Sequence, residues 1–154
     1  MKIPKNRIDI TIEVLCLVIL AGVTIYVLAG WSFFPDQIPM HYNAAGEIDR
    51  WGSKGEIFFP LAVTWILYLF ITLLSRHPAM WNTGVSVTPE NSARAYRILK
   101  YMIGTLKLAM VAVLSYLTVN TSTGGPLPGW FLPVTLILTL GDIAFWLICL
   151  IRNR

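Results

Sequence analysis

The chain has 154 residues, and its composition excludes a soluble globular domain. Hydrophobic residues make up 56% of it and charged residues only 13%, and the mean hydropathy is +0.65. Soluble domains carry about 25% charged residues, so this chain has too few charges to cover its own surface in water. We therefore expect a lipid bilayer around it. The net charge of +4 arises from short basic clusters beside apolar segments, without the basic stripe that would indicate a nucleic-acid partner.

Four apolar segments are long enough to cross a bilayer, whose hydrocarbon core of about 30 Å needs about 20 helical residues. Thr88-Pro89-Glu90 is a helix start signal, with a hydroxyl N-cap, a proline in the first turn and then an acid. The third helix should therefore begin before the membrane, with Arg94 and Arg97 outside it. The sequence predicts an all-α integral membrane protein, a four-helix transmembrane bundle that forms a single domain over residues 1–154. The expected helices cover residues 10–33, 57–75, 89–119 and 130–151.

The basic residues predict the orientation of this bundle. Nine of them lie in the N-terminal tail, the C-terminal tail and the segment from residue 76 to residue 100, whereas the segment 34–56 carries only Arg50 and Lys54. Because basic residues concentrate on the cytoplasmic side, both termini and the loop 76–93 should be cytoplasmic, and the segment 34–56 should face outward. The first apolar segment has no convincing cleavage site, so we expect a retained helix rather than a signal peptide.

The segment 34–56 is expected to form an ordered extracytoplasmic cap over the bundle. Its prolines restrict the backbone, and its glycines are spaced as turn residues. Asn43 to Gly46 looks like a turn that needs a positive φ at Gly46. Four apolar side chains could supply a small core for the cap: Ile38, Tyr42, Ile48 and Trp51.

From Pro35 to Lys54 the cap reads Pro-Asp-x-Ile-Pro-x-His-Tyr-Asn-x-x-Gly-x-x-Asp-x-Trp-Gly-Ser-Lys. This pattern resembles the signature of a bacterial membrane family that carries the domain of unknown function 1648. The same module forms the N-terminal part of SdpI-type proteins, which confer immunity to a secreted toxin. His-Pro at 77 and 78 and the stretch from Thr88 to Arg97 look like shorter pieces of the same family. The resemblance implies a multi-pass protein of the bacterial cytoplasmic (inner) membrane.

The conspicuous residues of the cap are our candidate ligand-binding residues, and we expect His41, Asp49 and Trp51 to face inward rather than toward water. Asp36, His41 and Asp49 could instead hold a metal ion, but spacings of five and eight residues do not indicate one. We expect a hydrogen-bonding network, with Lys54 paired to an acid, and neither a metal nor another cofactor. The candidate residues are Pro35, Asp36, Pro39, His41, Tyr42, Asn43, Gly46, Asp49, Trp51, Gly52 and Lys54.

A second group of candidates lies inside the predicted membrane spans. Lys107 and Asp142 each lie twelve residues from the outer end of their predicted helix, so antiparallel neighbours would hold both about 18 Å below that interface. We predict that they pair, because an unpaired charge at this depth costs about 2.5–3.5 kcal/mol. The pair could fix the helix register or form a site for a proton, an ion or a headgroup. Two further polar candidates are Tyr68 and Thr139, and Glu13 is expected to pair with Lys100 near the inner boundary.

Enzymatic activity is not expected, because no Ser-His-Asp order, paired carboxylates, phosphate loop or cysteine-based metal motif is present. The main functional hypothesis is a module that binds or senses a membrane-active peptide, a lipid or an envelope signal through the outer cap and the polar bundle interior. The alternative is a small transporter or ion-conducting protein that uses Lys107 and Asp142. Four helices are few for a pore, so this alternative requires a homo-oligomer.

Overall fold

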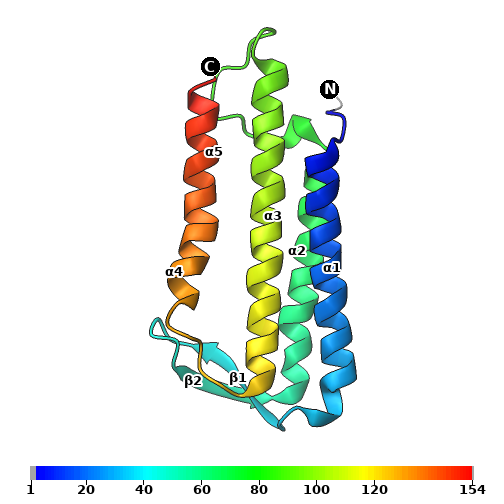
Figure 1. Ribbon diagram of the computed structural model, residues 1–154, viewed down its shortest axis with the longest axis vertical. Helices are drawn as coiled ribbons and strands as arrows, with labels where there is room; N and C mark the ends of the chain where they lie inside the picture. Colours follow the sequence, from blue (N-terminus) through cyan, green and yellow to red (C-terminus); the bar gives the residue numbers. More distant parts are fainter. Residues whose placement is uncertain (1–2, 154) are drawn as a thin grey trace.

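The computed structural model describes residues 3–153 as a bundle of long helices with a two-stranded hairpin across one end (Figure 1). Four helical stretches are long and apolar enough to cross a membrane, which confirms that part of the prediction. In chain order the main elements are α1 (Arg7–Gly30), β1 (Gln37–Tyr42), β2 (Ile48–Ser53), α2 (Phe58–Leu74), α3 (Ser92–Thr123), α4 (Phe131–Leu136) and α5 (Asp142–Ile151). Short 3₁₀-helical turns cover Trp31–Phe33, Lys54–Ile57 and Pro78–Met80, and a π-helical segment covers Ile137–Gly141.

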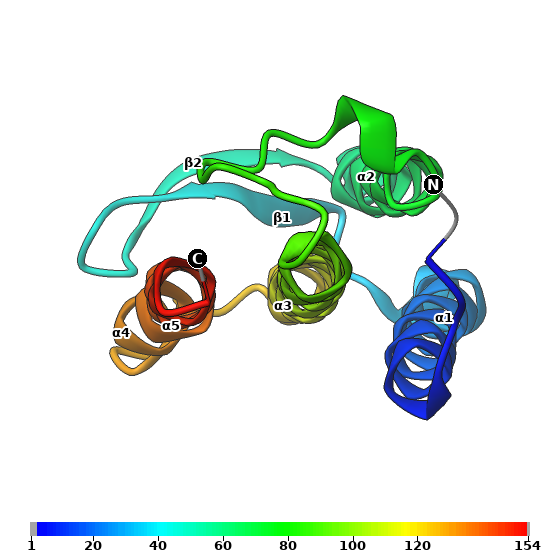
Figure 2. The same ribbon diagram turned by 90° about the horizontal axis from the view of Figure 1, so that it is seen from above.

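The central element of the bundle is α3, which contacts α1, α2 and α5. Seen along the bundle, α1 and α2 lie on one side of α3, and α4 and α5 lie on the other (Figure 2). The start of α1 and the end of α5 lie at the same end of the molecule, opposite the hairpin (Figure 1). Few residues of the α4–α5 stretch are buried, so this stretch is the most loosely packed of the four.

A single stripe of α1 makes its contacts with the bundle. The buried side chains recur every three or four residues, which places them on one helix face. The rest of α1 is apolar and exposed, as expected for a helix whose other faces meet lipid rather than water. At mid-length the stripe packs on Tyr68 of α2 and Val111 of α3. Its members are Ile12, Cys16, Leu20, Val23 and Val27.

The segment between α1 and α2 is an antiparallel hairpin, which the all-α prediction missed. Residue propensities do not predict these strands. β1 contains Pro39, and β2 contains an acid and a glycine, all of which disfavour strands. Its turn was predicted: Gly46 has φ +83°, and its N–H donates to the carbonyl of Asn43 at 2.9 Å. The hairpin packs on the bundle through Ile38, which is fully buried.

The predicted limits of the third helix were wrong at both ends. α3 begins at Ser92 rather than Pro89, because Thr88 and the next residues form a turn in which the Thr88 N–H donates to the Asn91 side chain at 2.8 Å. It continues to Thr123, where Gly124 ends it with φ +73°. Glycine commonly ends helices in this left-handed conformation. The 32 residues of α3 make it about 48 Å long, longer than a hydrocarbon core.

The fourth membrane-length stretch is not the continuous α-helix that was predicted over residues 130–151. The π-helical segment Ile137–Gly141 separates α4 from α5. Within it, the Thr139 hydroxyl donates to the Thr135 carbonyl at 2.8 Å, a local bond that often bends helices. Such π-helical interruptions are frequent at functional sites. Here the interruption directly precedes Asp142.

Gly46→Ala should detach the hairpin tip from the loop that precedes α4. A Cβ atom at Gly46 would lie 2.6 Å from the Leu127 carbonyl oxygen, and φ is +83°. The left-handed conformation alone costs a residue other than glycine about 1–2 kcal/mol, so the midpoint of thermal unfolding in detergent should fall. Gly55→Ala is the control, because its nearest neighbour would be at 3.9 Å. Equal midpoints for the two variants would contradict the docking.

Candidate functional site: a cavity under the hairpin and a buried polar cluster

A cavity of about 500 Å³ lies between the hairpin and the helices. Its walls come from four separate parts of the chain: residues 39–46 of the hairpin, the start of α2, the end of α3 and the segment 127–132 that leads into α4. The hairpin therefore forms the cavity by docking, because its residues alone would supply only one wall.

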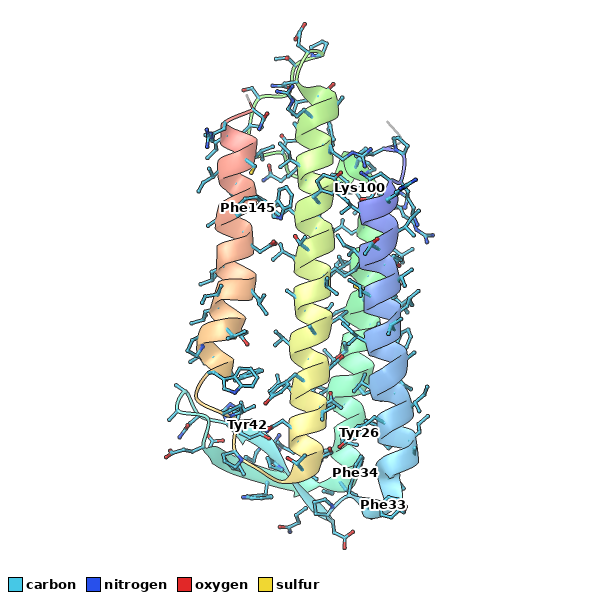
Figure 3. All side chains as sticks on the ribbon, in the orientation of Figure 1. Tyr26, Phe33, Phe34, Tyr42, Lys100 and Phe145 are labelled. Carbon is cyan, nitrogen blue, oxygen red and sulfur yellow. The ribbon has the colours of Figure 1, made fainter. Side chains whose placement is uncertain are left out.

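Two contacts dock the hairpin over this cavity. The Leu127 N–H donates to the Gly46 carbonyl at 2.8 Å, which ties the tip to the loop after α3. Tyr42 extends from β1 to the end of α3, where its hydroxyl accepts from the Asn120 side chain at 3.1 Å (Figure 3). The same hydroxyl donates to the Gly125 carbonyl at 3.4 Å. The hairpin is thus held at its tip and at the end of β1 next to the turn.

The walls of the cavity are mostly apolar, with a few polar groups among them. Phe59, Leu117 and Phe131 contribute apolar surface from three different helices. His41 and Asn43 come from the hairpin, and both are exposed. An apolar cavity with a small number of polar groups is typical of ligand-binding sites. The arrangement suits a ligand with an apolar part and a polar part.

The structure divides the predicted cap residues into two groups. Five line the cavity: Pro39, His41, Tyr42, Asn43 and Gly46. The other six, which do not line it, are Pro35, Asp36, Asp49, Trp51, Gly52 and Lys54. Several of these six stabilise the hairpin itself. Lys54, predicted to pair with an acid, pairs with Asp36 at 3.1 Å, and a Cβ atom at Gly52 would lie 2.6 Å from Met40.

The prediction that His41, Asp49 and Trp51 face inward is wrong for Asp49 and Trp51, whereas His41 lines the cavity although it is exposed. His41 and Asp49 pair across the hairpin at 2.6 Å, and 64% and 44% of their side-chain surfaces are exposed. Trp51 is 50% exposed. Asp36 is bonded to Lys54 instead of joining them, and no cluster of three metal-ligating side chains is found in residues 3–153.

Sequence reasoning missed the walls that lie outside the cap. Phe59, Leu117 and Phe131 appeared there only as apolar residues of predicted spans. Nothing in a helical apolar segment distinguishes a residue that lines a cavity from one that meets lipid. Thr121 offered a weak signal, as a hydroxyl near the end of a span.

A buried ion pair lies farther along the bundle, and it is not the pair that was predicted. The Lys107 Nζ lies 2.6 Å from Glu13 Oε2 of α1 and 3.0 Å from Thr72 Oγ1 of α2. The Tyr68 hydroxyl donates to the other oxygen of Glu13, and the Lys107 Nζ lies 5.0 Å from the centre of the Tyr68 ring. Only 4% of the Lys107 side chain is exposed. The predicted Lys107–Asp142 pair and the predicted Glu13–Lys100 pair are therefore both wrong.

The Lys107–Asp142 prediction failed because Lys107 lies on the face of α3 that points away from α5. Successive residues of an α-helix are about 100° apart, so Lys107 and Thr105 point in nearly opposite directions from α3. Lys107 faces α1 and α2, whereas Thr105 faces α5 and donates to Asp142 at 2.9 Å. Equal depth in two spans is therefore not sufficient for contact.

Asp142 is held by neutral groups. Besides the Thr105 hydroxyl, the Trp146 indole N–H donates to it at 3.1 Å. Within residues 3–153 no basic side chain forms an ion pair with it. It lines an open space of about 560 Å³ between α3 and α5, beside Phe145 (Figure 3). The predicted candidate Thr139 bonds its own helix backbone instead.

Breaking the Lys107–Glu13 pair should destabilise the protein more than removing Asp142. Removal of one partner of a buried ion pair costs about 3–5 kcal/mol of folding stability. Because 26% of the Glu13 side chain is exposed, we expect a cost near the lower end of this range. Lys107→Met and Glu13→Gln should each lower the midpoint of thermal unfolding in detergent. The double variant should regain most of the lost stability. Lys107→Met with Asp142→Asn is the control cycle, expected to be additive to about 0.5 kcal/mol. Coupling in the control cycle, or additivity in the first, would contradict the observed pairing.

Comparison with known proteins finds a family match over the hairpin and its flanking helices. An uncharacterized protein of Archaeoglobus fulgidus is 26% identical over 113 residues, which cover 66% of this chain and 62% of that protein. The alignment thus spans less than two thirds of the relative. No solved structure matches the chain. Residues 18–72 match the family described as domain of unknown function (DUF1648). This match runs from the middle of α1 through the hairpin to the end of α2, which is the domain that the resemblance predicted.

Proposed function

We propose that the protein binds a membrane-active peptide in the cavity under the hairpin and acts as a binding or sensing module. The observation that carries this proposal is the cavity of about 500 Å³, which has mostly apolar walls and lies at one end of the membrane-length helices. Ligand sites typically have volumes of about 300–1,000 Å³ and a similar lining.

The chemistry of the walls supports a peptide. A membrane-active peptide presents apolar side chains on one face and lies at the boundary between headgroups and acyl chains. Its apolar side chains would contact Phe59, Leu117 and Phe131, while the Thr121 hydroxyl and the one Asn43 amide hydrogen that is not donated to Glu47 could bond its backbone. A lipid or another envelope signal would use the same apolar walls, and the binding test below separates these ligands.

The resemblance to SdpI-type immunity proteins also supports a peptide ligand. Those proteins protect against a secreted toxin, and the resemblance covers Pro35 to Lys54, which includes the whole hairpin. This support is an analogy at the level of a family, because one fold can host several functions. α3 runs from the cavity to the opposite end of the bundle, so it could report an occupied cavity to a partner there.

We place the protein in the bacterial cytoplasmic membrane with both termini inside and the hairpin outside. Nine basic residues belong to the tails and the segment 76–100, against two in the segment 34–56. The start of α1 and the end of α5 lie at the same end of the bundle, which is compatible with two termini on one side (Figure 1).

A small oligomeric transporter is the alternative, and it loses its original basis. That hypothesis used a Lys107–Asp142 pair, whereas Lys107 is bonded to Glu13. A transport pathway would have to pass through the Lys107–Glu13 pair or along Asp142, on opposite sides of α3. Proteoliposome flux that is lost in Lys107→Ala would revive this alternative.

Ala44→Trp should block the cavity and weaken peptide binding. Ala44 lines the cavity at the exposed hairpin turn, so an indole there would occupy the space without entering the core. In nanodiscs, labelled membrane-active peptides from a panel should bind the native protein, and at least one should bind Ala44→Trp about tenfold more weakly or worse, a loss of about 1.4 kcal/mol. Cells that produce the native protein should survive that peptide better than cells that produce the variant.

Ala79→Trp is the matched control for this experiment. Ala79 is exposed near the opposite end of the bundle and does not line the cavity. The Ala79→Trp variant should bind the peptide as tightly as the native protein does. No difference between the two variants across the panel would contradict peptide binding. Loss of bound phospholipid in Ala44→Trp, without loss of any peptide, would assign the cavity to lipid.

Cysteine labelling should show the proposed orientation. Ser53 and Ser86 are both exposed, and they lie at opposite ends of the helices. In intact cells a membrane-impermeant maleimide should label Ser53→Cys but label Ser86→Cys only after lysis. The native Cys16 and Cys149 lie within membrane-length helices and should give little background. Labelling of Ser86→Cys in intact cells would reverse the orientation.

A further inference from the structure

A second cavity, of about 350 Å³, lies at the end of the bundle opposite the hairpin. It is enclosed by the N-terminal tail, the first turns of α1, the end of α2 and the first half of α3. Its inner end reaches the buried Lys107–Glu13 pair, and its outer part is bordered by Lys5 and Arg76, which are both exposed. It therefore connects the surface of the bundle to its buried charges.

The lining of this cavity has an excess of positive charge. Four basic side chains line it, against two acidic ones, Asp9 and Glu13. Both acids are already neutralised: Asp9 lies 3.1 Å from Lys100 and 3.2 Å from Arg97, and Glu13 pairs with Lys107. By contrast, Lys5 and Arg76 form no ion pair within residues 3–153. Two positive charges at the opening are thus free to meet an anion.

The tail wall of the cavity is held in place by the bundle. The Lys100 Nζ donates to the Ile3 carbonyl at 3.2 Å, and the Arg97 guanidinium donates to the Pro4 carbonyl at 3.0 Å. Figure 3 shows Lys100 between α3 and the start of α1. Asn6 then starts α1 with a capping box formed with Asp9. These bonds place Lys5 beside the cavity instead of leaving it on a loose chain end.

We propose that this cavity binds a phosphate group, supplied by the headgroup of an anionic phospholipid. Headgroup phosphates lie just outside the hydrocarbon core, at the level where membrane-spanning helices end. The end of α2 is at this level, and Arg76 follows it directly, so its guanidinium can donate to a phosphate there. Basic pockets between membrane helices bind anionic headgroups in this way. Lys5 and Arg76 contact the phosphate, while Lys100 holds the tail that carries Lys5.

The test compares two double variants that remove the same charge from the same end of the molecule. Lys5→Gln with Arg76→Gln removes the two free charges of the cavity. Arg94→Gln with Arg152→Gln removes two exposed charges that do not line it. Each protein is titrated in neutral detergent with short-chain phosphatidylglycerol, phosphatidylcholine or inorganic phosphate, and binding is followed by native mass spectrometry and thermal shift. The single variants Lys5→Gln and Arg76→Gln are measured as well, so that one poorly folded protein does not decide the result.

The native protein should prefer phosphatidylglycerol to phosphatidylcholine, and the cavity variant should lose about 25-fold in affinity, about fivefold for each charge. The surface variant should stay within about twofold of the native protein. Binding of inorganic phosphate that is lost only in the cavity variant would assign the site to free phosphate. Equal losses in both double variants, or no preference for phosphatidylglycerol in the native protein, would overturn the proposal.

Discussion

A charge buried among apolar helices must be neutralised, and the Lys107–Glu13 pair is where this constraint acts on the bundle. An ammonium group left alone at the centre of a membrane-spanning helix costs about 2.5–3.5 kcal/mol. Glu13 of α1 supplies the opposite charge, and Thr72 of α2 supplies an acceptor. One side chain of α3 therefore fixes the relative register of three helices. It also fixes the rotation of α3, so that the face with Thr105 points toward α5.

This rotation divides the molecule into a tighter and a looser half. α1 and α2 pack on α3 through buried apolar side chains around Tyr68 and Val111. The stretch of α4 and α5 has few buried residues, contains a π-helical interruption and leaves space beside Asp142. The hairpin spans both halves, because it packs on the first through Ile38 and bonds the loop before α4 through Gly46. A ligand under the hairpin would touch both halves at once.

The two ends of the bundle offer different chemistry. At the hairpin end the cavity has mostly apolar walls, with amide and hydroxyl groups among them. At the opposite end the cavity is lined by four basic and two acidic side chains. The difference follows the distribution of charge along the chain, in which basic residues gather in the tails and beside the helix ends. The same asymmetry that orients a membrane protein thus also creates a surface suited to anions.

The sequence by itself determined the membrane-length helices, the turn at Gly46, the pairing of Lys54 with an acid and the match of residues 18–72 to DUF1648. Each of these depends on local composition, on spacing or on a continuous motif. The strands of the hairpin and the partners of Lys107 and Asp142 were decided by the tertiary structure. Strand pairing required a docked surface, and apolar cavity walls look like lipid-facing residues in sequence. Ion pairing depended on helix rotation, which is set by packing among several helices, whereas sequence spacing gives only depth.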